Sequence, residues 1–140
     1  MNLSYPDAAV WALAFPATAL LLVALIGRRV GGALAVGLVY GVIFFGLLVS
    51  FTSRYLGPLP WAALSVLEGV LTAVALILIT LAYRWIPTAF PGAWARLLLL
   101  PAVVAALWVG REVFVGSWPY GGFPWARLGM SQAESPLAPV

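Results

Sequence analysis

The residues that could do chemistry in this chain are few, and their types exclude most forms of catalysis. The 140 residues contain no histidine, cysteine or lysine, and the four acids are Asp7, Glu68, Glu112 and Glu134. A Ser–His–Asp triad, a cysteine nucleophile, a Schiff-base lysine and a His/Cys metal site are therefore excluded. We expect no catalytic residue, no metal and no cofactor within this chain.

Glu68 lies inside a long apolar stretch, about two helical turns from Trp61. A carboxylate in hydrocarbon is costly, and such residues usually face the interior of a helix bundle or a cavity. Two interpretations follow, namely a proton or head-group site, or a structural glutamate that pairs with a neighbouring helix. Because buried acids are often structural, the second interpretation is favoured.

Arg111 and Glu112 are adjacent at the end of another apolar stretch. On a helix, neighbouring residues point about 100° apart, so each of these two side chains needs its own partner or the membrane interface. The two residues either hold the end of this helix against the following loop or simply mark where the membrane ends. The second interpretation is slightly favoured.

An aromatic segment, Ser117–Trp125, follows this helix. Its nine residues include four aromatics, two prolines and two glycines. This composition is too rigid and too aromatic for a simple linker. We expect the segment to lie on the membrane surface and to shape an entrance for lipid chains.

The elements that must position these residues are membrane helices. The chain is 64% hydrophobic and 8% charged, whereas soluble domains carry roughly 25% charged residues. A spanning helix needs about 20 apolar residues and must satisfy its backbone internally. We therefore predict an all-α integral membrane bundle of about four transmembrane helices over residues 1–115, with an interfacial loop over residues 116–140. The predicted spans are residues 8–27, 33–51, 61–83 and 97–115.

Arginine positions orient the predicted bundle. The connections around residues 28–32 and 84–96 hold four arginines, and the opposite side holds three. The positive-inside rule places the richer side in the cytoplasm, so residues 116–140 are expected outside it, in a multi-pass protein of the cell membrane. The arginines form no basic stripe, so nucleic acid is not an expected partner.

Gly37 and Gly41 form a Gly-x-x-x-Gly pattern in the second predicted span. Small residues at this spacing let another backbone approach closely. We expect the pattern to serve helix packing within the chain rather than dimerisation.

Three motifs follow one another near the C-terminus. They are Gly-Gly-Phe-Pro-Trp at residues 121–125, Arg-Leu-Gly-Met-Ser-Gln at 127–132 and Ser-Pro-Leu-Ala-Pro at 135–139. Their order and spacing resemble the apolipoprotein N-acyltransferase family, whose members carry a Gly-Phe-Pro-Trp, a Gly-Tyr-Ser-Gln-like step and then a Pro-Leu. The turn at Arg111-Glu112 also resembles the family's helix end, which carries a glutamate.

The resemblance implies an activity for the whole family. Its members are bacterial inner-membrane enzymes that transfer a fatty acyl chain from a phospholipid to the N-terminal diacylglyceryl-cysteine of lipoproteins. A nitrilase-like domain outside the cytoplasm does this chemistry with a Glu-Lys-Cys triad, in which the cysteine carries the acyl group as a thioester. The resemblance makes five residues of this chain candidates for a substrate channel, namely Gly122, Phe123, Pro124, Trp125 and Gln132.

The sequence departs from the family in one decisive way. Without a cysteine or a lysine, no residue of the triad is present. We therefore expect this chain to be the membrane portion of such an enzyme, inactive alone, with the nitrilase-like domain supplied in cis or in trans.

Two alternatives stay open. The chain could be a small non-enzymatic membrane protein, such as an assembly subunit, a transporter or a channel, with Glu68 as its functional residue. It could also be a divergent remnant that docks onto a separately encoded catalytic chain.

Overall fold

The computed structural model describes residues 1–5, 10–118, 121–133, 135, 136 and 138, and within them it is built from helices and turns without a strand. Asp7 and Glu134 lie outside the described residues, as do Pro119 and Tyr120 of the aromatic segment and Leu137 and Pro139 of the last motif. The long helices are α1 (Ala14–Leu25), α2 (Val30–Leu48), α4 (Pro58–Ala89) and α5 (Leu100–Val115). The short elements are η1 (Asn2–Ser4), η2 (Trp11–Leu13), α3 (Thr52–Leu56), η3 (Ala95–Leu99), η4 (Pro124–Ala126) and η5 (Leu128–Gln132).

The predicted all-α class is confirmed, and most of the long helices have the length that a bilayer demands. Three of them are long and apolar enough to cross a membrane, namely Val30–Leu48, Pro58–Ala89 and Ala95–Val115. The first predicted span, residues 8–27, contains a shorter apolar helix, Trp11–Leu25. The positions at which each helix enters and leaves the bilayer stay predictions.

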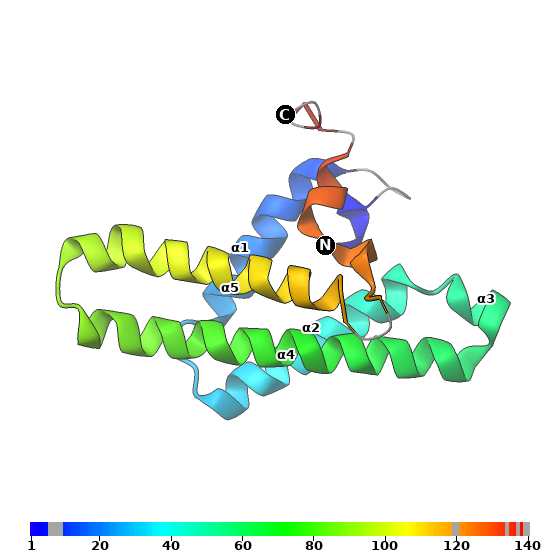
Figure 1. The fold of residues 1–140 in the computed structure, drawn as a ribbon, viewed down its shortest axis with the longest axis horizontal. Coiled ribbons are helices and arrows are strands. Elements are labelled where there is room, and N and C mark those ends of the chain that lie inside the picture. The colour runs from blue at the N-terminus through cyan, green and yellow to red at the C-terminus, as the bar shows by residue number, and fades with distance from the viewer. Residues whose placement is uncertain (6–9, 119–120, 134, 137, 139–140) are drawn as a thin grey trace.

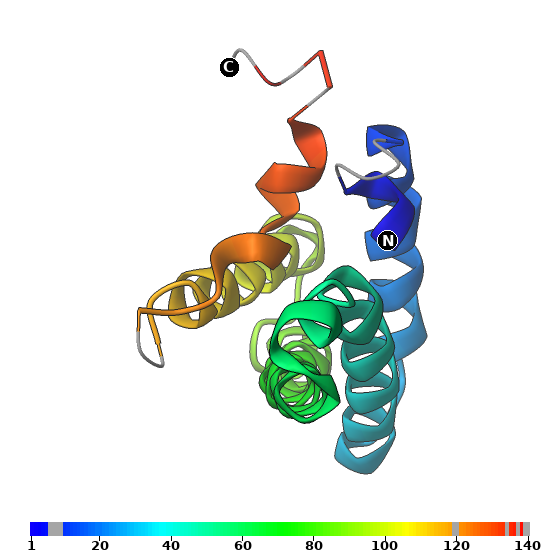
Figure 2. The same cartoon turned by 90° about the vertical axis from the view of Figure 1, so that its right-hand side faces the viewer.

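Helix α4 is the central element of the bundle. It runs antiparallel to α5, and α2 packs against it and crosses behind it in this view (Figure 1). Viewed nearly along α4, the helices α2 and α1 lie to one side of it and α5 to the other (Figure 2). All the other long helices thus contact a single long helix.

The α2–α4 contact is the closest in the bundle, because glycines face one another across it. A Cβ atom placed on Gly41 would lie 2.6 Å from the Cα of Gly69, and one on Gly37 would lie 2.5 Å from the Cα of Ala73. Small residues allow this approach, which maximises van der Waals contact between the backbones. The expectation that the Gly-x-x-x-Gly pattern packs helices within the chain is confirmed.

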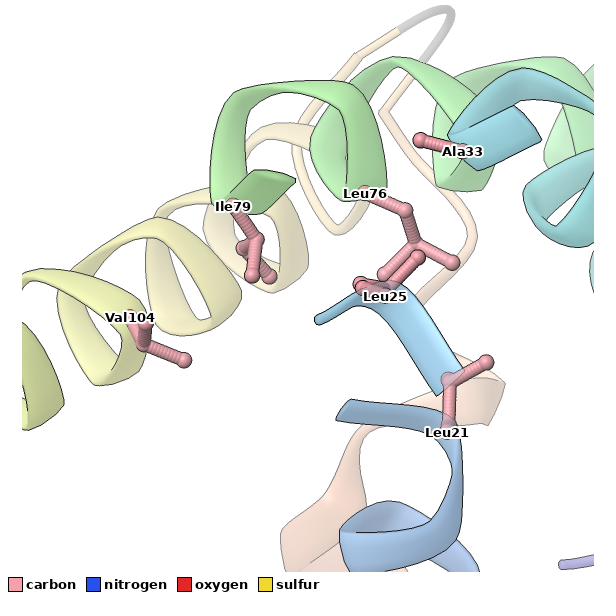
Figure 3. Packing of buried hydrophobic residues seen from close by; sticks show 6 residues of the cluster. All are labelled: Leu21, Leu25, Ala33, Leu76, Ile79 and Val104. Carbon is pink, nitrogen blue, oxygen red and sulfur yellow. The ribbon is translucent and has the colours of Figure 1, made fainter. Parts of the chain in front are cut away.

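Four helices contribute to the main apolar core. Figure 3 shows the buried side chains of this cluster, which come from α1, α2, α4 and α5: Leu21, Leu25, Ala33, Leu76, Ile79 and Val104. A second, smaller cluster joins the N-terminal turn and η4 to α2: Tyr5, Phe44, Phe45 and Ala126. The second cluster holds the segment after α5 against the rest of the molecule.

The helix that ends in α5 begins with one π-helical turn, η3, which continues directly into α5. Pro101 follows this turn. A proline has no backbone N–H, and its ring collides with the carbonyl four residues earlier in a regular α-helix. The wider π-helical turn accommodates this proline without ending the helix.

The glycine contact makes a stability prediction. Replacing Gly41 by alanine should lower the free energy of unfolding by about 1–3 kcal/mol, because the added methyl forces α2 away from α4. Thermal unfolding in detergent, followed by circular dichroism, measures this loss. Gly46→Ala on the same helix is the matched control, since a Cβ there would lie 3.7 Å from the Trp61 ring, an ordinary contact. Equal stability of the two variants would contradict the prediction.

Candidate functional site: the loop docked on the end of α5

The segment after α5 turns back sharply onto the helix end. Gly122 has a φ of +78°, in the left-handed region that glycine adopts without steric cost. A Cβ at Gly122 would overlap the backbone of Gly116, so this close approach requires glycine. Phe123 N then donates a hydrogen bond to Val115 O at 2.7 Å. We call residues 122–132 the docked loop. Its first residues, Gly122 and Phe123, fix it to the end of α5.

Glu112 makes the second attachment of the docked loop. Its Oε1 accepts a hydrogen bond from Leu128 N at 2.9 Å and one from Trp108 Nε1 at 2.9 Å. The guanidinium of Arg127 lies over Gly116, where a Cβ would stand 2.5 Å from its Nη2. For Glu112 these contacts support the interpretation that it holds the helix end against the loop.

The N-terminal turn makes the third attachment. The hydroxyl of Tyr5 donates to Ala126 O at 2.9 Å and lies 3.3 Å from Arg127 O, and only 3% of Tyr5 is exposed. Burial raises the pKa of the Tyr5 hydroxyl, so it keeps the proton that it donates. Asn2 Nδ2 donates to Phe44 O at 3.1 Å, which fastens the same turn to α2. No periodic pattern surrounds Tyr5, so its role could not be predicted from the sequence.

The two predicted aromatic candidates occupy different environments. Phe123 packs against the buried cluster around Phe45, so it holds the loop down. Trp125 is 56% exposed, and its ring centroid lies 6.5 Å from that of Phe51. Trp125 is therefore the large ring that the docked loop presents to its surroundings.

Gln132 lies at the other end of the docked loop, beside the start of α1. Its Nε2 donates to Trp11 O at 3.3 Å and to Ser131 Oγ at 3.1 Å, and its Oε1 has no hydrogen-bond partner among the described residues. Gln132 borders an apolar groove of about 550 Å³ between α1 and α5. The groove's other lining residues include Phe15, Thr18, Leu22, Trp108, Glu112 and Leu128.

Glu68 and Arg111 meet inside the bundle, on α4 and α5. Arg111 Nη2 lies 3.7 Å from Glu68 Oε2 and donates to Thr72 Oγ1 at 2.8 Å, and its Cζ stands 5.4 Å from the Phe45 ring centroid. The cavity beside Arg111 and Tyr40 measures about 10 Å³, room for a single water molecule and too small for a lipid head group. This arrangement favours the structural interpretation of Glu68 over an ion path or a head-group site.

The predicted site residues thus fall into two groups. The docked loop brings together Gly122, Phe123, Pro124 and Trp125 at the end of α5, with Gln132 at the far side near α1, and Glu112 is its anchor. Arg111, one residue earlier, points to Glu68 in the bundle instead. Among the described residues, no three acidic side chains are grouped so that they could hold a metal ion.

The fold and the docked loop define a helical membrane domain with a rigid aromatic loop at one end. The family model of the apolipoprotein N-acyltransferase N-terminal domain matches residues 1–140. The chain therefore belongs to the apolipoprotein N-acyltransferase family, which confirms the resemblance drawn from its motifs.

Longer proteins that are similar to this chain are named apolipoprotein N-acyltransferase. An apolipoprotein N-acyltransferase of Vibrio vulnificus is 34% identical over 140 residues, covering 98% of this chain and 27% of that protein. One of Azotobacter vinelandii is 37% identical over 135 residues, covering 92% of this chain and 25% of that protein. The chain thus spans about a quarter of the length of these relatives. No solved structure matches it at a significant level.

The N-terminal attachment can be tested by removing one oxygen. Tyr5→Phe should lower the free energy of unfolding by about 0.5–1.5 kcal/mol, because two carbonyls lose their donor. The matched control is Tyr55→Phe, since Tyr55 is 83% exposed and its hydroxyl makes no hydrogen bond to the described residues. Chemical denaturation in detergent compares the two variants, and an equal effect of both substitutions would refute a specific role for the Tyr5 hydroxyl.

Proposed function

We propose that this chain is the membrane portion of a phospholipid:apolipoprotein N-acyltransferase of the bacterial inner membrane. The family assignment carries the proposal, and the docked loop with its neighbouring groove supports it. The acyl donor is a phospholipid, and the acceptor is the N-terminal diacylglyceryl-cysteine of a lipoprotein. The thiol, lysine and glutamate of the reaction come from a nitrilase-like domain outside this chain.

The docked loop would contribute by shaping the entrance for acyl chains at the membrane surface. Three separate attachments hold it, through Val115, Glu112 and Tyr5. A rigid loop can hold Trp125 at a fixed place above the helices, and such positioning matters because a small displacement of a substrate lowers the rate steeply. The apolar groove that Gln132 borders offers a surface for a lipid chain beside the loop. Residues 116–140 would then face the catalytic side, outside the cytoplasm.

The exposed ring is the sharpest test of this role. In a full-length family member that carries this segment, Trp125→Ala should reduce lipoprotein acylation by about tenfold to a hundredfold while the protein still inserts into the membrane. Trp94→Ala is the matched control, because Trp94 is 55% exposed and also contacts one phenylalanine, Phe90. Acylation of a radiolabelled lipoprotein measures both variants. Normal acylation by the Trp125→Ala variant would show that the docked loop does not take part in acyl transfer.

A further prediction concerns the chain by itself. The purified 140-residue protein should transfer no acyl chain from phospholipid, because it contains no cysteine to carry a thioester. Incubation with labelled phospholipid and a diacylglyceryl peptide, followed by mass spectrometry, checks this. Acylated peptide formed by this chain alone would contradict the assignment of the chemistry to another domain.

A further inference from the structure

Helix α5 is held to the bundle by little apolar packing. Only 11% of the most apolar stretch of Ala95–Val115 is buried, against 44% for α4. Its buried side chains within Leu100–Val115 are Val104 and Val115. In a bilayer, lipid tails are as apolar as the side chains that they replace, so apolar contact alone fixes the rotation of such a helix weakly.

Arg111 supplies the contacts that apolar packing does not. Its guanidinium touches Glu68 and Thr72 on α4 and stands over Phe45 on α2. These partners lie on two different helices, so the contacts that the guanidinium makes with them depend on the rotation of α5. Arg111 side-chain exposure is 11% and that of Glu68 is 2%, so the contacts are shielded from water and lipid.

The rotation of α5 determines where Glu112 points. Glu112 follows Arg111 directly, so its side chain leaves the helix about 100° away, towards the docked loop. There it accepts the hydrogen bond of Leu128 N. Turning α5 by part of a turn would carry the carboxylate away from this amide, and the loop would lose its central attachment.

We propose that Glu68 and Arg111 are positioning residues, which lock the rotation of α5 and thereby hold the docked loop in place through Glu112. Neither side chain needs to contact a substrate for this role. Its consequence for acyl transfer rests on the function proposed above, whereas its effect on the loop can be measured on this chain alone.

Amide hydrogen exchange of residues 122–133, measured by mass spectrometry on the chain in lipid nanodiscs, tests the lock. Arg111→Met should speed this exchange about tenfold, the ratio that corresponds to about 1.4 kcal/mol of lost contact. Exchange in α2 should change much less. Arg96→Met, the same substitution at an exposed arginine at the other end of this helix, should leave the loop unchanged. Unchanged loop exchange in Arg111→Met would overturn the proposal.

A second variant separates positioning from simple stability. Glu68→Met/Arg111→Met removes both charges, so no unpaired charge is left buried and the bundle should fold with near-normal stability. If the pair positions α5, the loop in this stable variant should still exchange about as fast as in Arg111→Met. Slow, native-like exchange in the double variant would show that packing alone holds α5, and the proposal would fall.

Acylation by a full-length family member with the same substitutions distinguishes this inference from the proposed function. Fast loop exchange with normal acylation would overturn the role of the loop in acyl transfer, and the positioning role of Glu68 and Arg111 would stand. Slow loop exchange with lost acylation would overturn the positioning role of Glu68 and Arg111, and the proposed acyltransferase function would stand.

Discussion

Where α2 meets α4, the two backbones come so close that a methyl group on Gly41 would strike Gly69. A membrane bundle gains little from burying apolar surface against other apolar surface, so intimate backbone packing is its main source of cohesion. This contact also sets the level of α2 along α4. Phe45 therefore stands where the guanidinium of Arg111 can lie over its ring, and Phe44 stands where Asn2 reaches its carbonyl.

The end of α5 shows a division of tasks between two adjacent charged residues. Arg111 faces inward and joins α5 to α4 and α2, while Glu112 faces the docked loop and Trp108. Polar contacts of this kind cost desolvation, and they persist in a membrane because the alternative is an unsatisfied polar group in hydrocarbon. The position of the docked loop thus depends on the Arg111 contacts inside the bundle, through Glu112, as well as on the tight turn at Gly122.

The fold was largely predictable, because composition and the length of apolar runs dictate helices in a membrane. The spacing of Gly37 and Gly41 also indicated their packing role. The meeting of Glu68 with Arg111 was not predictable, since it depends on how far α5 slides along α4, which no local pattern encodes. Tyr5 was missed for a similar reason, as its partners are backbone carbonyls of a distant loop. The Gly-Phe-Pro-Trp motif located the site, but the opposite roles of partly buried Phe123 and exposed Trp125 emerged only from the packing.

The length of α4 has a consequence for how the domain sits in its bilayer. Its 32 residues extend about 48 Å, well beyond the roughly 30 Å of hydrocarbon. Trp61 and Trp85 are separated by about 36 Å along this helix, close to the spacing of the two head-group layers. Past the end of α5, the first turns of α4 continue on the side where the docked loop lies (Figure 1). Helix α4 is therefore longer than the hydrocarbon alone requires, so we expect its two ends to extend into the head-group layers or the helix to tilt.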